Sequence, residues 1–216
     1  METKTGVETH NRIQEQARIL FMRYGIRSVS MDDIAGGLGM SKKTIYQFFA
    51  DKDELVEAII DADIRDLQVD CDYCFAGSAN AIDEVFQTMD RMLEHLQNLN
   101  PNLLYDLKKF HFKSYRKFLQ HKNSYLREII SKNLERGIKE ELYRNDINVE
   151  VLSLYRLESM MVAFNQEVFP SDKFNLAEVT RLIIEHFVFG LTTLKGHKLI
   201  LQYQQERTKK KKDDNR

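Results

Sequence analysis

The residue types that most often carry catalysis or bind metals are sparse in this sequence. Its two cysteines, Cys71 and Cys74, form a single C-x-x-C pair, and its six histidines are scattered. A zinc site takes four ligands, and no second cysteine pair or H-x-x-x-H follows to complete one. We therefore expect surface or half-buried thiols. The motifs of nucleotide-binding loops, serine hydrolases and zinc proteases are also missing, so we predict no enzyme, no catalytic residues, no metal site and no cofactor.

Three polar residues near the N-terminus indicate a different chemistry. Lys43, Tyr46 and Gln47 follow one another at helical spacings, so they share one face of a helix. The apolar Ile45 and Phe49 fall on the opposite side. A cation, a phenol and an amide on one exposed face can bind phosphate and hydrogen-bond to the edge of a base. The alternative is an ordinary solvated helix face.

The elements around these residues predict a helix-turn-helix. An apolar stripe indicates a first helix over residues 11–24. Ser30 then opens a capping box, S-M-D-D, before a short second helix that Gly39 ends. Ser41 caps a third helix over residues 42–49. Two helices joined by a short glycine turn form the arrangement that places the second helix in a DNA major groove.

The motifs of this region resemble those of a known family. S-M-D-D-I-A at residues 30–35, L-G-M-S-K-K-T-I-Y at 38–46 and F-A-D-K-D-E-L at 49–55 look like the DNA-binding domain of the TetR family of transcriptional regulators. The sequence departs from the family pattern at Gly36 and Gly37, where helix-favouring residues are usual. Residues 9–52 carry seven Lys or Arg against four Asp or Glu, whereas the whole chain has a net charge of −1.

The resemblance implies roles for individual residues. The family's phosphate-contacting positions hold Ser30, Thr44, Tyr46 and Lys52, and its base-contacting positions hold Lys43 and Gln47. Ser30 and Ser41 would also place helix N-termini, with free N–H groups, at the DNA backbone. Alternatively, both serines are only caps and Tyr46 is a core residue. The predicted DNA-binding residues are Ser30, Ser41, Lys42, Lys43, Thr44, Tyr46, Gln47 and Lys52.

Composition predicts an all-α fold for the whole chain. Its 216 residues include only 9 Gly and 2 Pro, and sheets need more turn residues than that. No apolar run approaches the roughly 18 residues of a membrane span, and the first residues lack the apolar core of a signal peptide, so we expect a soluble cytoplasmic protein without a membrane partner. The predicted domains are a three-helix DNA-binding domain (1–53), a larger helical effector-binding and dimerisation domain (54–207) and a disordered charged tail (208–216).

The last two predicted helices, residues 149–169 and 176–205, are apolar over much of their circumference. A helix that covers one core needs one apolar stripe, so two apolar faces indicate a second partner. The resemblance implies that these helices form a four-helix bundle between two subunits, and the alternative is a central helix within a monomer. The predicted interface residues are Met161, Phe187, Gly190, Leu191 and Leu194.

An aromatic cluster in residues 103–119 predicts a ligand pocket. Ligand cavities are mostly apolar and aromatic with a few polar groups, and Met side chains adapt to irregular shapes. No inward cluster of arginines is evident, so we expect a flat or apolar ligand. The alternative is packed core. The predicted pocket residues are Met89, Met92, Phe110, His111, Tyr115, Met160 and Phe164.

The sequence thus predicts a dimeric, sequence-specific DNA-binding regulator. We expect a repressor that binds a palindromic operator in double-stranded DNA and is released by a small apolar or aromatic molecule. One alternative is a ligand-independent DNA-binding protein of the same fold, acting as an activator, a division factor or a nucleoid factor. The other is a helical-bundle enzyme or carrier, for which no cofactor motif is found.

Overall fold

The computed structural model describes the backbone of residues 4–97 and 99–213 and the side chains of residues 6–97 and 99–207. Within these ranges every regular element is a helix, and the strand-like pairing is one isolated bridge between Tyr143 and Thr192. The all-α prediction is confirmed. None of the described helices is both long and apolar enough to cross a membrane. The chain divides into two compact units.

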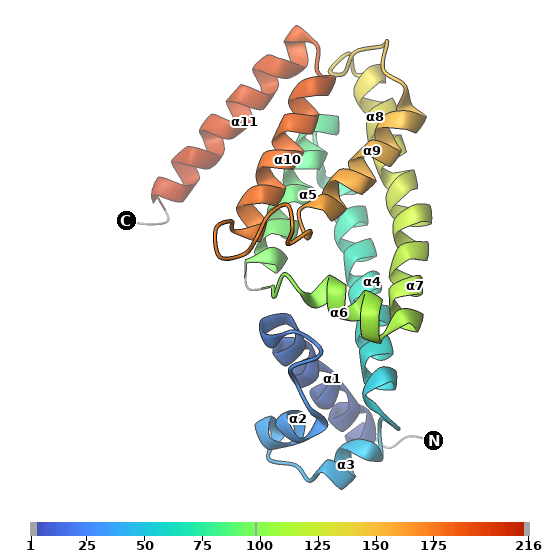
Figure 1. The fold of residues 1–216 in the computed structure, drawn as a ribbon. Helices are drawn as coiled ribbons and strands as arrows, with labels where there is room; N and C mark the ends of the chain where they lie inside the picture. Colours follow the sequence, from blue (N-terminus) through green and yellow to red (C-terminus); the bar gives the residue numbers. More distant parts are fainter. Residues whose placement is uncertain (1–3, 98, 214–216) are drawn as a thin grey trace. The chain divides into compact units, whose positions relative to one another are not determined.

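The N-terminal unit (Met1–Gln68 and Gln97–His121) contains the predicted helix-turn-helix and two further helices. The first helix begins at Lys4, earlier than the predicted residue 11, and Gly25 follows its end with a φ of 83°. The helices of this unit are α1 (Lys4–Tyr24), α2 (Met31–Leu38), α3 (Lys42–Tyr46), the first part of α4 (Lys52–Gly77), α6 (Leu103–Phe110) and α7 (Phe112–His121) (Figure 1).

The core of the N-terminal unit forms where the apolar faces of its first four helices meet. Ile13 and Phe21, on the stripe predicted for α1, are buried. Ile34 of α2, Ile45 of α3 and Leu55 of α4 are buried in the same cluster. Burying one such side chain contributes about 1.5–3 kcal/mol. Since Ile45 anchors one face of α3 in this core, the other face of α3 is left to solvent.

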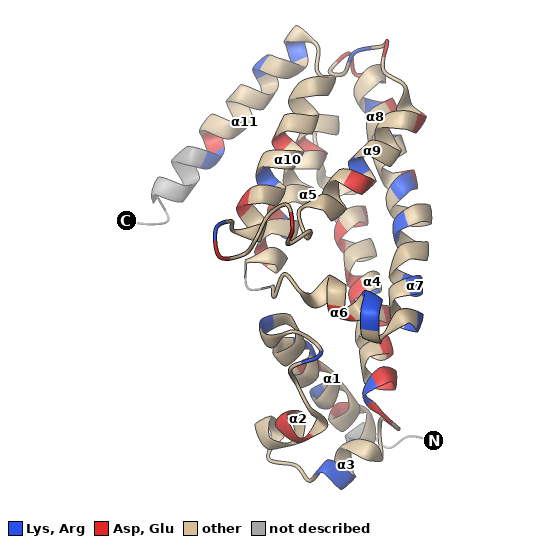
Figure 2. Ribbon diagram, in the orientation of Figure 1, with Lys and Arg blue, Asp and Glu red and all other residues tan. Residues whose placement is uncertain are grey.

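The helices α6 and α7 make polar contacts with α4 and with the segment between α1 and α2. Lys117 of α7 lies 2.8 Å from Glu57 and 2.6 Å from Asp61, both on α4. The buried Asp106 of α6 accepts a hydrogen bond from the N–H of Arg27 at 2.9 Å. Figure 2 shows the acidic stretch of α4 and the basic stretch of α7. Both helices lie within residues 54–207, which the sequence predicts to be the effector-binding and dimerisation domain. That domain is defined by its function, so its boundaries stay a prediction.

The C-terminal unit (Val69–Leu96 and Lys122–Arg216) is a bundle of helices. The helix predicted over residues 149–169 ends at Val162. The helices of this unit are the end of α4, α5 (Ala81–Leu96), a π-helical turn η1 (Lys122–Leu126), α8 (Arg127–Lys139), α9 (Val149–Val162), α10 (Leu176–Leu191) and α11 (Leu194–Asp213). The last of these extends into the predicted disordered tail, of which residues 214–216 lie outside the described residues.

The helix predicted over residues 176–205 is interrupted between α10 and α11. The segment after α8 pairs there with the segment after α10: the N–H of Arg144 donates to the carbonyl of Leu191 at 2.9 Å, and the N–H of Thr193 to that of Leu142 at 3.0 Å. A Cβ at Gly196 would lie 2.2 Å from the Leu142 carbonyl oxygen. Glycine is therefore required at this position by the close approach of the two backbones.

Cys71 and Cys74 are buried in the C-terminal unit and free of any disulfide. The prediction of surface or half-buried thiols is therefore wrong. Both cysteines lie on α4 and are at most 5% exposed. Burial raises the pKa of Cys71 to about 12, so this thiol is un-ionised at neutral pH and behaves as a small apolar side chain.

Candidate nucleic-acid interface

Ser30 caps α2 through a complete capping box, as predicted. Its Oγ accepts a hydrogen bond from the N–H of Asp33 at 3.2 Å, and Asp33 Oδ2 accepts one from the N–H of Ser30 at 2.7 Å. The Ser30 hydroxyl also donates to the same carboxylate at 2.6 Å. These bonds favour the ionised carboxylate and lower the pKa of Asp33. The start of α2 is thus fixed by local chemistry.

The turn between α2 and α3 is made by Gly39 and Ser41. Gly39 has a φ of 64°, in the left-handed region that glycine adopts without strain. Ser41 Oγ accepts a hydrogen bond from the N–H of Thr44 at 3.1 Å and lies 2.8 Å from the Thr44 hydroxyl, which confirms the predicted cap. Regular helix ends at Tyr46, sooner than predicted, and Phe49 enters the core after a turn.

The exposed face of α3 carries the residues that the spacing predicted. Lys43 and Gln47 are exposed, and Tyr46 is 44% exposed, whereas Ile45 is 0% exposed. Tyr46 is therefore not a core residue. Figure 2 shows the basic stretch of α3, and Thr44 is half-buried beside it. A cation, a phenol and an amide stand together on one solvent face, which suits contact with phosphates and base edges.

Lys42 and Lys43 have different surroundings although they are adjacent in sequence. Lys42 Nζ lies 2.7 Å from Asp32 Oδ2 of α2, and this contact raises the pKa of Lys42. The ion pair links the two helices of the motif across the turn. For Lys43 no ion pair or side-chain hydrogen bond is found in the part of the chain that the structure describes. Its ammonium is therefore available to a phosphate or a base.

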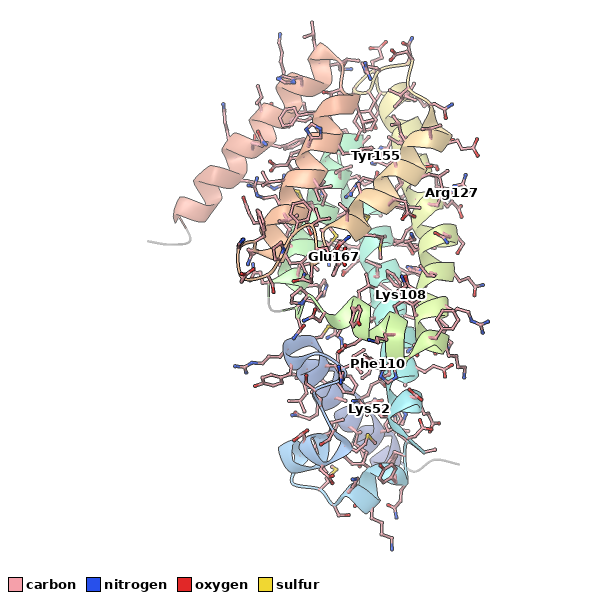
Figure 3. The ribbon with its side chains drawn as sticks, in the orientation of Figure 1. Lys52, Lys108, Phe110, Arg127, Tyr155 and Glu167 are labelled. Atoms are coloured by element: carbon pink, nitrogen blue, oxygen red, sulfur yellow. The ribbon has the colours of Figure 1, made fainter. Side chains whose placement is uncertain are left out.

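Lys52, at the start of α4, directs its ammonium into the protein (Figure 3). Nζ donates to the carbonyl oxygens of Ile26 and Val29, each at 2.5 Å, and lies 5.6 Å from the centre of the Phe21 ring. Burial lowers the pKa of Lys52. In this arrangement Lys52 ties α4 to the segment between α1 and α2, a role that the sequence did not reveal.

The predicted pocket residues are divided between the two units. Phe110, His111 and Tyr115 lie in the N-terminal unit, where His111 contacts Asp53 and the guanidinium of Arg27 lies over Phe110 at 5.3 Å (Figure 3). The remaining members lie in the C-terminal unit and are Met89, Met92, Met160 and Phe164. The predicted pocket therefore draws on both units and stays a prediction.

A small hollow lies in the C-terminal unit among α5, α10 and α11. It is lined by apolar side chains such as Phe86, Met89 and Val188, together with Glu185. The space open to the centre of a water molecule is about 10 Å³, which is room for about one water. Of the predicted pocket residues it includes Met89.

The predicted dimer residues differ widely in exposure. Phe187 and Leu191 are buried in the core of their own C-terminal unit, whereas Leu194 is 84% exposed. Met161 is half-buried and Gly190 exposed. The apolar residues that α9 and α10 do present to solvent are Val151, Leu154, Tyr155, Val162 and Leu182.

Two buried polar residues of the C-terminal unit were missed from the sequence. Arg156 of α9 and Thr180 of α10 are buried, and each has a side-chain atom without a hydrogen-bond partner. Arg156 stands four residues from both Leu152 and Met160, so it occupies a position of the apolar stripe of its helix. A charged residue at a position where the helical pattern expects an apolar one is the sequence signal that would have identified Arg156.

Comparison with known proteins agrees with this geometry. The model of the family described as bacterial regulatory proteins, tetR family, matches residues 13–59, which include α2, the turn and α3. The chain is 27% identical over 169 residues to the uncharacterized HTH-type transcriptional regulator YvaF of Bacillus subtilis, an alignment that covers 76% of this chain and 86% of that protein.

Solved structures show the same fold. A TetR-family transcriptional regulator from Agrobacterium tumefaciens matches with a TM-score of 0.70 and 16% identity, over 87% of this chain and 99% of that one. A putative transcriptional regulator from Saccharomonospora viridis, solved in complex with choline, matches with a TM-score of 0.69 and 16% identity over the same shares. With the helix-turn-helix and the sequence matches, these findings show that residues 13–59 carry the DNA-binding domain of the TetR family and that the chain is a DNA-binding transcriptional regulator.

Proposed function

We propose that the protein is a homodimeric, sequence-specific repressor that binds a palindromic operator and is released from it by a small molecule. The observation that carries the DNA-binding part is the exposed face of α3, where Lys43, Tyr46 and Gln47 stand opposite the buried Ile45. Both helices of the motif are capped at their first turn, and the turn between them is fixed by Gly39. A rigid reading face of this kind is what base discrimination requires.

Each exposed residue has a distinct task on DNA. The Gln47 amide can pair with two groups of an adenine edge, and the Lys43 ammonium can donate to a guanine edge. The Tyr46 hydroxyl and the first turn of α2, behind Ser30, suit phosphate oxygens, because phosphate contacts position a protein on the duplex. These roles agree with those that the family resemblance implies for the same positions.

The proposal is tested by selecting operators from a random DNA library. Gln47→Ala should change the preferred base at one position of each half-site, with a loss of about 1–3 kcal/mol on the original operator. The matched control is Gln202→Ala, since Gln202 is exposed on α11. If a protein with both Lys43→Ala and Gln47→Ala selects the same operator with the same affinity, α3 does not read bases.

Dimerisation is supported by an apolar stripe on α9. Val151, Leu154, Tyr155 and Val162 are exposed at helical spacings, and Leu182 is exposed on α10. Of these residues Tyr155 is labelled in Figure 3. These residues replace Phe187 and Leu191 in the proposed interface, because those two are already buried in the subunit's own core. A two-fold dimer would present two reading helices to the two halves of a palindrome.

The ligand-release part is supported by the Saccharomonospora viridis relative, whose fold was solved in complex with a small molecule, choline. A second candidate is a ligand-independent regulator of the same fold. The hollow among α5, α10 and α11 has room for about one water and is too small to hold a molecule such as choline. The two candidates differ in whether any small molecule weakens operator binding.

A further inference from the structure

Arg156, in the middle of α9, is a buried charge without a counter-charge. It is 8% exposed, and its Nη1 atom is closed to solvent and has no hydrogen-bond partner. In the described ranges no acidic side chain forms an ion pair with its guanidinium. The contact that is observed is with the Phe187 ring of α10, whose centre lies 5.7 Å from the guanidinium carbon.

A guanidinium in this state is unusual on physical grounds. Buried charges in proteins are paired and hydrogen-bonded, since removing a single ion from water is costly. Burial lowers the pKa of Arg156 to about 10, so the group still carries its charge at neutral pH. The face of one aromatic ring offsets little of that cost. The free protein therefore holds a cation whose natural partner is an anion.

Thr180 of α10 is a second buried polar group of the C-terminal unit. It is 3% exposed, and among the described residues its hydroxyl has no hydrogen-bond partner. Thr180 and Phe187 are seven residues apart on α10, so they lie on one face of the helix, about 10 Å apart along its axis.

Other buried polar groups of this region are satisfied. The hydroxyl of Ser153, on α9, donates to the carbonyl of Glu150 at 2.9 Å. The buried Lys122 of η1 lies 2.6 Å from the Glu158 carboxylate. Arg156 and Thr180 are therefore exceptions within their own surroundings, which points to a missing ligand rather than to a generally polar core.

We propose that Arg156 binds the carboxylate of a small organic acid and that this acid is the molecule that releases the repressor. A carboxylate carries the single negative charge that one guanidinium balances, whereas a phosphate dianion would leave a buried excess. The apolar remainder of the acid would lie against Phe187 and its neighbours. This inference rests on the proposed function and replaces the expected uncharged, flat or apolar ligand.

The burial of Arg156 also suggests how the acid would act. Because Nη1 is closed to solvent, an acid reaches it when α9 and α10 separate at this contact. A ligand shifts a conformational equilibrium only when it binds one state better than the other. The separated state, which opens Nη1 to the acid, meets that condition.

The test uses the full-length protein with octanoate and benzoate as acids and with octanol and benzyl alcohol as uncharged controls of similar shape. At millimolar concentration an acid should raise the melting temperature of the wild type and weaken its operator affinity about 5- to 150-fold, the usual range of allosteric coupling. The alcohols should do neither. Arg156→Met, which keeps the side-chain length without the charge, should bind operator normally and lose both responses.

The outcomes separate the two proposals. If the alcohols release the operator and the acids do not, ligand-released repression stands and the acid site is refuted. If acids raise the melting temperature through Arg156 but leave operator affinity unchanged, the acid site stands and the release mechanism fails. A wild type that no acid of the panel affects refutes the acid site. So does an Arg156→Met protein that melts well below the wild type without ligand, because the arginine would then be a satisfied structural residue.

Discussion

Substitutions at Lys52 and Lys43 test which of these two lysines stabilises the fold and which contacts DNA. The family resemblance places Lys52 at a phosphate, whereas in the structure its ammonium donates to the carbonyls of Ile26 and Val29 at 2.5 Å each. Lys43 has no such contact within the described residues and is exposed. The same substitution, Lys→Ala, should therefore have opposite effects at the two positions.

The expected loss of stability at Lys52 follows from these bonds. A hydrogen bond from a charged group contributes about 1.5–3 kcal/mol, and the partial exposure of Lys52 puts its two bonds at the lower end. Lys52→Ala should then lower the free energy of unfolding by about 2–3 kcal/mol, and each kcal/mol corresponds to about 2–4 °C in melting temperature for a chain of this size. Lys43→Ala should change the free energy of unfolding by no more than about 0.5 kcal/mol.

Salt dependence of operator binding gives the second measurement. The logarithm of the binding constant falls with the logarithm of salt concentration, with a slope of about 0.9 per phosphate contact. Lys43→Ala should reduce that slope by about one if its ammonium contacts a phosphate, while Lys52→Ala should leave it unchanged at a temperature where the variant is folded. A Lys52→Ala protein that melts like the wild type and loses one unit of slope would refute the structural role given to Lys52.

Two further predictions concern helical glycines and the dimer. Gly36→Ala should stabilise the protein by about 0.8–1 kcal/mol, because a Cβ there meets nothing within 4 Å. Gly137→Ala should destabilise the protein by at least about 1–3 kcal/mol, because its Cβ would lie 2.0 Å from the buried Tyr143 ring. Melting temperatures equal to that of the wild type would contradict both predictions. Leu154→Glu should give a folded monomer with weakened operator binding in sedimentation and binding assays, while the exposed control Val69→Glu stays dimeric. A Leu154→Glu protein that sediments as a dimer would contradict the proposed interface.

The N-terminal elements could be predicted because their signals are local. Ser30, Gly39 and Ser41 each act on a backbone group within a few residues, so sequence spacing alone locates the caps and the turn. The burial of Ile45 and the exposure of Tyr46 followed from helical periodicity. These features leave the polar face of α3 open to solvent. They could be predicted without information about contacts to the rest of the chain.

The C-terminal unit was harder to predict because its determinants are contacts between distant segments. The break before α11 depends on Leu142 meeting Thr193, and no proline or run of glycines marks it. Periodicity showed that Phe187 lies on an apolar face but not whether that face is covered by the same subunit. The carbonyl partners of Lys52 likewise come from a segment more than twenty residues away, so its charge alone suggested DNA.

Adjacent residues of α9 connect the proposed acid site with the proposed dimer interface. Tyr155 belongs to the exposed stripe and Arg156 to the buried side, yet both contact the same Phe187 ring of α10, at 6.0 Å between ring centres and 5.7 Å from the guanidinium carbon. A separation of α9 from α10 that admits an acid at Arg156 must therefore also displace Tyr155 and the stripe around it. Since packed helices shift as units rather than bend continuously, one ligand contact can change the geometry of a dimer. Linkage then requires the reverse effect, so that operator DNA weakens binding of the acid by the same factor.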